Sequence, residues 1–104
     1  MIKTLKRQID FDRVFKRGTK YYGKTLSVIV LKSDELKIGY AVSKKHGKAV
    51  VRNRIKRLLR AAVRNVFGEF KGKNYIIILP KVKEEYVFSE YLEDITKIVR
   101  KENL

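Results

Sequence analysis

The sequence predicts an α+β fold in a single domain, with one β-sheet packed by helices. Three observations support this prediction. The chain has 104 residues, a length that suits one domain and is too short for two comfortable ones. Apolar, β-branched runs that are typical of strands alternate with segments of helical periodicity. No repeat, low-complexity tract or linker divides the chain, so the domain is expected to span residues 1–104.

The first predicted element is a short helix over residues 9–17. Phe11, Val14 and Phe15 recur at i, i+3 and i+4, as the apolar face of a helix requires. Gly18 follows at the position of a C-terminal glycine cap. The segment TKYYG, residues 19–23, is interpreted as a short strand that follows this helix.

Two longer strands are predicted next. Residues 25–32, TLSVIVLK, are apolar and β-branched, and residues 36–43, LKIGYAVS, alternate well enough to form a returning strand. The letters SDE between them indicate a turn. The two strands are therefore expected to pair as a hairpin.

The second half of the chain predicts a helix, a strand and a final helix. The first of these helices should run over residues 49–67, after the basic loop KKHGK. Residues 74–80, NYIIILP, form a fully apolar run, which favours a central strand covered on both faces. The last helix should start near Ser89 as its N-cap and carry an apolar face of Tyr91, Leu92, Ile95, Ile98 and Val99.

Charge gives the first indication of function. The formal net charge is +15, which favours a polyanionic partner such as RNA, DNA or an anionic membrane surface. Ten Lys or Arg residues and no Asp or Glu lie between Leu36 and Gly68. Helices usually offset their cations with acidic residues at i and i+4, and the helix expected after Gly47 has none. A partner molecule is therefore expected to supply the negative charge.

A helical wheel places the cations of this helix opposite its apolar side chains. The apolar face gathers Val51, Ile55, Leu58, Leu59, Ala62 and Val66. The opposite face gathers Arg52, Asn53, Lys56, Arg57, Arg60 and Arg64, and Arg54 falls near the edge of the apolar stripe. Arginine binds phosphate bidentately and stacks on bases, so this face is interpreted as a phosphate-binding ridge. The alternative is an ordinary solvated helix face, which the missing acidic residues make the weaker interpretation.

Several other classes of site are disfavoured. The chain has no cysteine, which excludes disulfide scaffolds and cysteine-based zinc sites. The single histidine, His46, is interpreted as an exposed loop residue, and no carboxylate cluster resembles a two-metal nuclease site. A stand-alone nuclease is therefore disfavoured. The N-terminus lacks the apolar segment of a secretory signal, and a cytoplasmic location is expected.

The aromatic residues leave two interpretations open. Phe11 and Phe15 are most simply core residues of the first helix. Tyr21, Tyr22 and Tyr40 lie in or beside predicted strands. These tyrosines suit either packing in the core or at an edge, or stacking on unpaired bases.

Residues 42–60, VSKKHGKAVVRNRIKRLLR, closely resemble the signature of the bacterial ribonuclease P protein component. The centre of that signature is the RNR element, here Arg52-Asn53-Arg54, followed by Lys56 and Arg57. The upstream segment DFDRVFKRGT resembles the family's first helix, and the YIIILP strand and a terminal amphipathic helix follow in the family's order. The resemblance covers nearly the whole chain.

The resemblance implies a fold and a function. The implied fold has the order α-β-β-β-α-β-α, a mixed four-stranded sheet packed by helices and a left-handed β-α-β crossover around the basic helix. The implied function is that of a small subunit of a ribonucleoprotein that removes the 5′ leader from precursor tRNA. The RNA subunit would hold the catalytic Mg²⁺ ions and carry out the chemistry, so the protein alone is expected to be non-catalytic and to hold no metal.

The resemblance also implies two binding surfaces. The surface for the catalytic RNA would comprise Lys44, Lys45, Arg52, Asn53, Arg54, Lys56, Arg57, Arg60 and Arg64. The cleft for the single-stranded 5′ leader would comprise Phe11, Phe15, Ser27, Ile29 and Tyr40. Some relatives have a tyrosine at the position of Ile29, and Tyr40 is included as its substitute. No membrane and no small-molecule substrate are expected.

Two other function classes remain as alternatives. A ribosomal or general RNA-binding structural protein would share the charge but would not depend on one RNA partner. A membrane-surface protein is less favoured, because the basic helix sets Leu and Val, and not Trp and Phe, against its charges.

Overall fold

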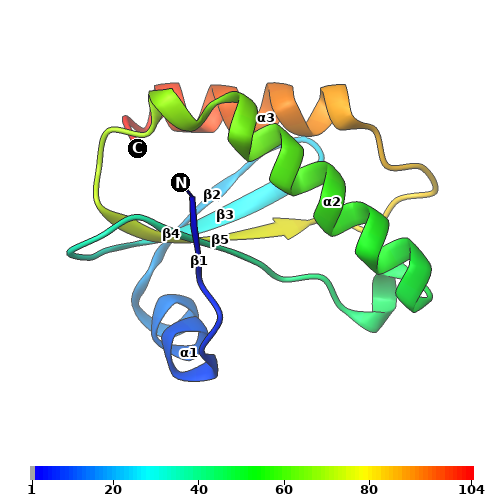
Figure 1. The fold of residues 1–104 in the computed structure, drawn as a ribbon, viewed down its shortest axis with the longest axis horizontal. Helices are drawn as coiled ribbons and strands as arrows, with labels where there is room; N and C mark the ends of the chain where they lie inside the picture. The colour runs from blue at the N-terminus through cyan, green and yellow to red at the C-terminus, as the bar shows by residue number, and fades with distance from the viewer. Residues whose placement is uncertain (1) are drawn as a thin grey trace.

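One mixed five-stranded sheet, in the order β1-β4-β5-β3-β2, forms the centre of the fold (Figure 1). The protein is described by a computed structural model that covers residues 2–104. Helices α2 and α3 cover one face of the sheet and α1 lies against the other (Figure 1). The elements are, in order, β1 (Lys3–Thr4), α1 (Gln8–Arg17), β2 (Thr19–Tyr22), β3 (Leu26–Lys32), β4 (Lys37–Tyr40), the 3₁₀ helix η1 (Lys44–His46), α2 (Ala49–Asn65), the 3₁₀ helix η2 (Phe67–Glu69), β5 (Asn74–Pro80) and α3 (Phe88–Lys101).

The predicted α+β class and the α-β-β-β-α-β-α order are confirmed, with one addition. The four expected strands are β2 to β5, and β1 adds a fifth. This strand is only two residues long and pairs in parallel with β4, with Lys3 opposite Lys37. A segment so short carries no periodicity, so only its tertiary pairing reveals it.

Strand β5 is the central strand, as its apolar run predicts. It pairs antiparallel with β3 along its whole length, from Leu26↔Pro80 to Lys32↔Asn74, and in parallel with β4. Ile76 and Ile78 are buried under α2 and α3, whereas Ile77 is buried on the α1 face. Both faces of β5 are therefore covered, which explains why its sequence does not alternate.

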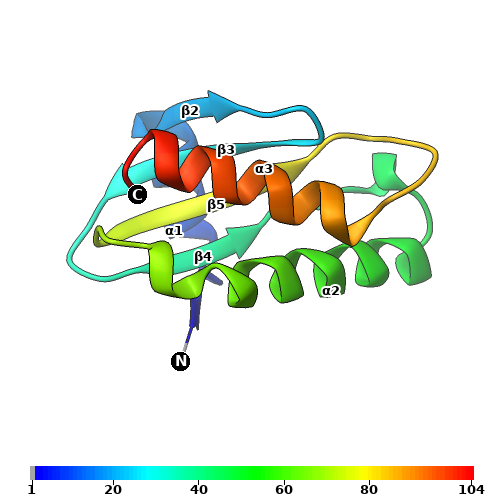
Figure 2. The ribbon, with the colours of Figure 1, turned by 90° about the horizontal axis from the view of Figure 1, so that it is seen from above.

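The predicted hairpin between residues 25–32 and 36–43 is wrong. Strand β5 lies between β3 and β4 in the sheet, so the two strands are sequence neighbours that do not pair. The parallel partner of β4 is β5, and the connection between them runs through α2. Figure 2 looks onto the helix side of the sheet, where the chain leaves β4, returns along α2 in front of the sheet and enters β5. This path makes the crossover left-handed, against the usual rule, as the family resemblance implies.

Helix α1 is held against the sheet by a small second core. Leu5, Val14, Ile29 and Ile77 are its buried members. Gly18 ends the helix, but with an ordinary φ of −74° and not in the left-handed conformation of a glycine cap. Glycine is needed because a Cβ at this position would lie 2.5 Å from both the Ile29 Cγ2 atom and the Val14 carbonyl oxygen. The prediction of a glycine at the helix end is correct, but close packing is the reason.

Two helix boundaries differ from the prediction. Helix α3 begins at Phe88, and its N-cap is Val87, which provides no side-chain hydrogen bond, so the predicted Ser89 cap is wrong. Helix α2 ends at Asn65, and residues 67–69 form η2. Within residues 2–104, none of the helices combines the length and apolar character that a membrane crossing requires.

Candidate nucleic-acid interface

Helix α2 presents a row of cations to solvent because its opposite side is buried. Ile55, Leu59, Ala62 and Val63 are fully buried against the sheet and α3. At 3.6 residues per turn, the side chains between them must therefore point outward. We call the outward set the α2 ridge: Asn53, Arg54, Arg57, Arg60 and Arg64 are exposed and Lys56 is half-buried at its margin.

The cations of η1 and α2 have no acidic partner among the residues that the structure describes. All six ion pairs within residues 2–104 are made by cations that lie outside η1 and α2. Of the ten Lys and Arg residues between Leu36 and Gly68, only Lys37 is paired, with its Nζ 3.7 Å from Glu35. Neighbouring positive charges on one helix repel each other, so this surface favours a polyanion.

The wheel placed Arg52 and Arg54 incorrectly, and the structure reverses their positions. Arg54, expected at the edge of the apolar stripe, is exposed. Arg52 is half-buried, and its Nε atom is buried without a hydrogen-bond partner among residues 2–104. Arg52 is half-buried because it lies three residues before the buried Ile55, and residues three apart share one face of a helix. Arg52 therefore belongs to the base of the ridge.

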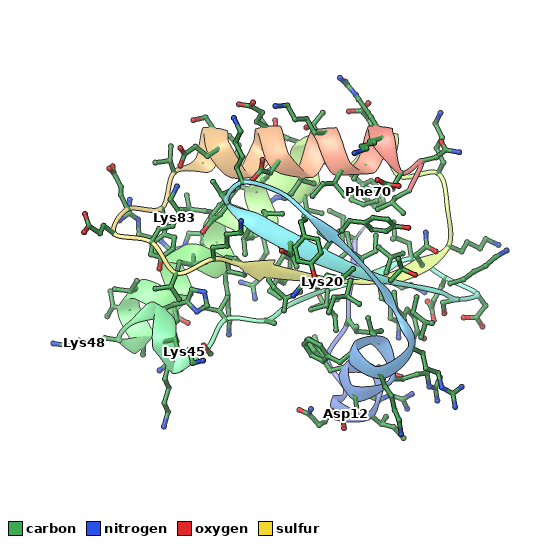
Figure 3. All side chains as sticks on the ribbon, turned by 180° about the vertical axis from the view of Figure 1, so that it is seen from behind. Asp12, Lys20, Lys45, Lys48, Phe70 and Lys83 are labelled. Carbon is green, nitrogen blue, oxygen red and sulfur yellow. The ribbon has the colours of Figure 1, made fainter. Side chains whose placement is uncertain are left out.

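The 3₁₀ helix η1 carries Lys44 and Lys45, which are both exposed. His46 fixes this helix to the sheet: the Ser43 backbone N–H donates to its Nδ1 atom at 3.2 Å. The Nε2 atom then carries the proton and donates to the Pro80 carbonyl at 2.7 Å. His46 is therefore half-buried and positions η1, which corrects its interpretation as an exposed loop residue. Figure 3 shows Lys45 and Lys48 projecting from this end of the molecule.

The first helix places its two phenylalanines differently. The Phe11 and Phe15 rings lie 6.4 Å apart between centroids. Phe11 is half-buried over Gly39, where a Cβ would lie 2.6 Å from the tip of its ring, so it is a core residue. Phe15 is 45% exposed, which leaves much of its ring available to a ligand.

Ser27 and Ile29 lie in β3, both buried, and Ile29 belongs to the core beneath α1. Side chains alternate along a strand, so Ser27 points to the same face of the sheet as Ile29. Helix α1 and η1 lie towards opposite ends of this face, and none of the helices described within residues 2–104 covers the part between them (Figures 1 and 3). We call this part of the sheet, around Ser27, the open face. The structure therefore gathers four of the five predicted leader-binding residues on one side of the sheet.

Tyr40 does not join them. It lies in β4 beside Ile38 and packs against the core under α2, on the other face of the sheet. The Arg60 guanidinium carbon lies 5.7 Å from the centroid of its ring, within the range of a cation–π contact. Burial raises the pKa of the Tyr40 hydroxyl to about 12, so the hydroxyl keeps its proton at neutral pH. The prediction that Tyr40 replaces a cleft tyrosine at Ile29 is therefore wrong in geometry.

Sequence reasoning missed a group of residues around Tyr40. Ile2 and Thr4 come from the N-terminal segment and Phe67 comes from η2, and all three line one pocket with Tyr40, Arg60 and Arg64. The sequence predicts Phe67 as the end of the basic helix and predicts no element for Ile2 and Thr4. Among residues 2–104, the structure brings together no group of three or more His, Asp or Glu side chains that could hold a metal ion.

Comparisons with known proteins cover nearly the whole chain. Residues 2–103 match the model of the protein family described as Ribonuclease P. The ribonuclease P protein component of Bacillus velezensis is 42% identical over 103 residues, which cover 96% of this chain and 89% of that protein. The ribonuclease P protein component of Finegoldia magna is 40% identical over 94 residues, with coverage of 88% and 83%.

Solved structures give the same result for the fold. The RNase P protein from Thermotoga maritima superposes with a TM-score of 0.83 at 26% identity, covering 95% of this chain and 96% of that one. The Staphylococcus aureus RNase P protein superposes with a TM-score of 0.82 at 24% identity, covering 98% and 96%.

Proposed function

This chain belongs to the ribonuclease P protein family, and from this premise we propose how its two faces divide the binding of RNA. The protein is a subunit of ribonuclease P, the endoribonuclease that processes the 5′ end of tRNA. Its role in the holoenzyme is accessory. Its partners are the RNA of ribonuclease P and precursor tRNA.

The α2 ridge and η1 bind the catalytic RNA. The observation that carries this proposal is the set of unpaired cations on these two elements, Lys44 and Lys45 included. Arg57, Arg60 and Arg64 follow one another at intervals of one turn on the exposed side, and each interval is comparable to the spacing of successive phosphates. Arg52 supports the ridge from below, and Asn53 offers a donor and an acceptor to a base edge or a 2′-hydroxyl.

The open face and Phe15 bind the 5′ leader of precursor tRNA. Phe15 offers an exposed ring for base stacking, which is independent of base sequence. Arg13, Lys16 and Arg17 lie on the same helix and add positive charge near it. Ile29 belongs to the apolar core beneath α1, and Ser27 is a buried polar residue on the same face of β3. Because this surface lies across the sheet from α2, the leader and the catalytic RNA occupy the protein at the same time.

Magnesium stays with the RNA in this proposal. Mg²⁺ is bound through oxygen ligands, usually with one or two carboxylates. The buried carboxylates, Asp10 and Asp94, are already engaged by Arg7 and by Thr25. Mg²⁺ is therefore expected to be held mainly by the RNA subunit. The cytoplasmic location of the protein stays a prediction.

Cleavage of precursor tRNA at low Mg²⁺ tests the proposed function. Three samples are compared: the protein alone, a bacterial catalytic RNA alone, and both together. We expect cleavage at the mature 5′ end to be much faster in the mixture and undetectable with the protein alone. Cleavage by the protein alone would overturn the accessory role, and no stimulation would favour a general RNA-binding protein.

A matched pair of variants tests the ridge. Arg57→Ala removes an unpaired charge from α2, and Lys101→Ala removes one from the exposed end of α3. We expect the affinity for the catalytic RNA to fall roughly tenfold with Arg57→Ala and by less than about twofold with Lys101→Ala. Equal effects of the two variants would contradict the assignment of the ridge.

A further inference from the structure

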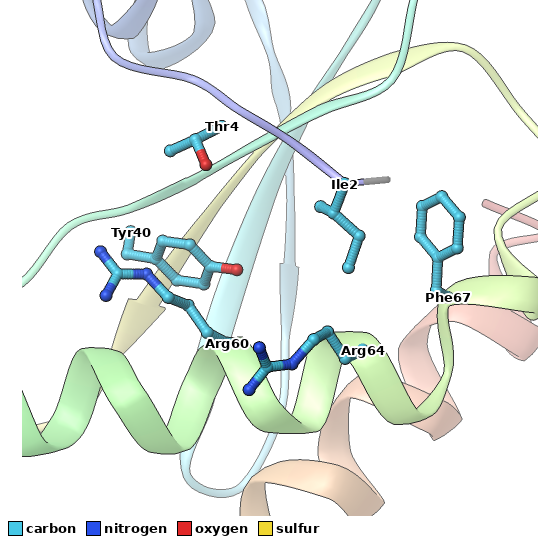
Figure 4. A pocket seen from close by; sticks show the side chains of 6 residues that line it. All are labelled: Ile2, Thr4, Tyr40, Arg60, Arg64 and Phe67. Carbon is cyan, nitrogen blue, oxygen red and sulfur yellow. The ribbon is translucent and has the colours of Figure 1, made fainter.

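A pocket lies between the edge of the sheet and the C-terminal half of α2. It has a volume of about 520 Å³ and is lined by Ile2, Thr4, Tyr40, Arg60, Arg64 and Phe67. Figure 4 shows these side chains converging from the N-terminal segment that includes β1 and from β4, α2 and η2, with the Tyr40 hydroxyl pointing into the space in front of Ile2. We call this pocket the Tyr40 pocket. Its volume lies within the roughly 300–1,000 Å³ range of sites that hold small organic groups.

The walls of the Tyr40 pocket combine flat apolar surfaces with positive charge. Phe67 is 36% exposed although it is a large aromatic residue, and Ile2 lies beside it, half-buried. Arg60 and Arg64 stand one helical turn apart at the rim, and no carboxylate lines the pocket. The Arg60 guanidinium carbon also lies 5.7 Å from the centroid of the Tyr40 ring, so a cation–π contact places the guanidinium group at the rim of the pocket.

This combination matches the chemistry of a single nucleotide. An unstacked base needs an aromatic or guanidinium surface and a polar group at its edge, and its phosphate needs a cation. Phe67 and the Arg60 guanidinium offer stacking surfaces, the Tyr40 hydroxyl can donate to a base edge, and Arg64 can reach a phosphate. A purely apolar ligand would leave both guanidinium groups without a partner.

We infer that the Tyr40 pocket receives one unstacked nucleotide of the catalytic RNA. This inference rests on the proposed function, in which the α2 ridge binds that RNA. The pocket continues the ridge, because Arg60 and Arg64 belong to both. The leader is not the source of the nucleotide, since Phe15 and the open face lie on the opposite side of the sheet.

The test compares chemical probing of the catalytic RNA bound by the wild-type protein and by pocket variants. Phe67→Leu removes the aromatic surface but keeps an apolar side chain, and Tyr40→Phe removes only the hydroxyl. The control is Tyr22→Leu, which removes a 73% exposed tyrosine that also has a lysine over its ring, on the far edge strand β2. Thermal unfolding of each variant establishes that it is folded.

We expect one unpaired nucleotide to be protected by the wild-type protein and by Tyr22→Leu and to be exposed with Phe67→Leu. Affinity for the catalytic RNA should fall roughly tenfold with Phe67→Leu and by a smaller factor with Tyr40→Phe. An RNA that is abasic at the identified position should bind the wild-type protein and Phe67→Leu equally well. No loss of protection at a single nucleotide, with folded variants, would overturn the inference.

Failure of this inference is distinguishable from failure of the proposed function. If Phe67→Leu binds like the wild type while Arg57→Ala still weakens binding tenfold, the Tyr40 pocket is structural and the ridge stands. If Arg57→Ala also has no effect, the proposed function fails as well. Loss of precursor-tRNA binding without loss of catalytic-RNA binding in Phe67→Leu would assign the pocket to the substrate and overturn the choice of partner.

Discussion

The Asp94 carboxylate accepts hydrogen bonds from both the backbone N–H and the hydroxyl of Thr25, with the backbone nitrogen at 2.6 Å from its Oδ2 atom. The two residues are 69 positions apart, and both are buried. The contact ties the turn between β2 and β3 to α3. Lys81 continues the same junction, because its backbone N–H donates to the Thr25 carbonyl at 2.9 Å.

Asp94→Ala should destabilise the fold strongly. The substitution leaves the Thr25 N–H and hydroxyl buried without an acceptor, and we expect the free energy of unfolding to fall by about 3 kcal/mol. Urea unfolding in phosphate buffer measures the loss. Glu93→Ala is the control, because Glu93 is the exposed neighbour on α3 and pairs only with Lys97. Similar losses for the two variants would show that the Asp94 contact contributes little.

Gly18→Ala should destabilise the protein although the backbone at Gly18 is ordinary. The added Cβ would lie 2.5 Å from the Ile29 Cγ2 atom and from the Val14 carbonyl oxygen, so α1 must shift away from β3. We expect a loss of about 1–3 kcal/mol in the free energy of unfolding. Gly68→Ala is the matched control, because a Cβ there meets nothing within 4 Å. A neutral Gly18→Ala variant would contradict the packing account.

Phe15→Ala should weaken the binding of precursor tRNA and spare mature tRNA. The exposed ring offers stacking to the leader, and the loss of one stacked base corresponds to about 1–3 kcal/mol of binding free energy. Binding of both tRNAs to the holoenzyme is the measurement. Val82→Ala is the control, because Val82 is a 57% exposed apolar residue between β5 and α3 and lies outside α1. An equal loss for precursor and mature tRNA would exclude the leader as the ligand.

Binding of the catalytic RNA should depend steeply on salt. Neutralising about six phosphates gives a slope of log affinity against log salt near −4 to −5. Arg57→Ala should reduce the magnitude of that slope by about one, because one phosphate contact is lost. Titrations at several salt concentrations with the wild type, Arg57→Ala and Lys101→Ala measure it. A slope that Arg57→Ala leaves unchanged would mean that Arg57 touches no phosphate.

Acid should remove the stabilisation that Asp10 provides to α1. The hydrogen bond from Arg7 lowers the pKa of the Asp10 carboxyl, despite an opposing effect of burial, and the nearby positive charges act in the same direction as Arg7. A carboxyl with a lowered pKa in the folded protein contributes stability above its unfolded pKa of about 3.9, and this contribution is lost as the pH falls through the folded pKa.

The difference in stability between the wild type and Asp10→Asn should therefore be constant from pH 7 to about pH 5 and shrink below about pH 4. Urea unfolding of both proteins across this range measures the difference. If the difference in unfolding free energy between the wild type and Asp10→Asn is as large near pH 3 as at pH 7, the ionised carboxylate is not the stabilising species.

The local sequence pattern was sufficient to predict β5, which is buried on both faces, and α2, which is buried along one face. The apolar run of β5 predicts its bounds, and the 3.6-residue period of residues 49–65 predicts α2 and most of its outward face. Pairing between strands was not predictable in this way. The short turn after β3 favoured a hairpin between β3 and β4. In the structure β5 lies between these two strands, and its pairing with β4 joins segments that α2 separates in the sequence.

The candidate sites divide along the same line. The exposed cations of α2 follow from charge and periodicity, whereas Arg52 shows that an idealised wheel misplaces residues at the margin of a buried stripe. The face of the sheet to which Tyr40 points depends on the register in which β4 pairs with β5, and the local sequence does not show that register. The pocket around it joins residues from four elements, and no local sequence signal connects Ile2 with Phe67.

The position of β5 has a consequence for synthesis on the ribosome. Residues 74–80 fill the centre of the sheet, so a nascent chain that ends before them holds β3 and β4 with edges that lack their native partner. Unpaired strand edges promote association between chains. The sheet can close only when the chain has been made as far as Pro80, and the uncompensated charge of α2, which is translated first, keeps such unfinished chains apart by mutual repulsion.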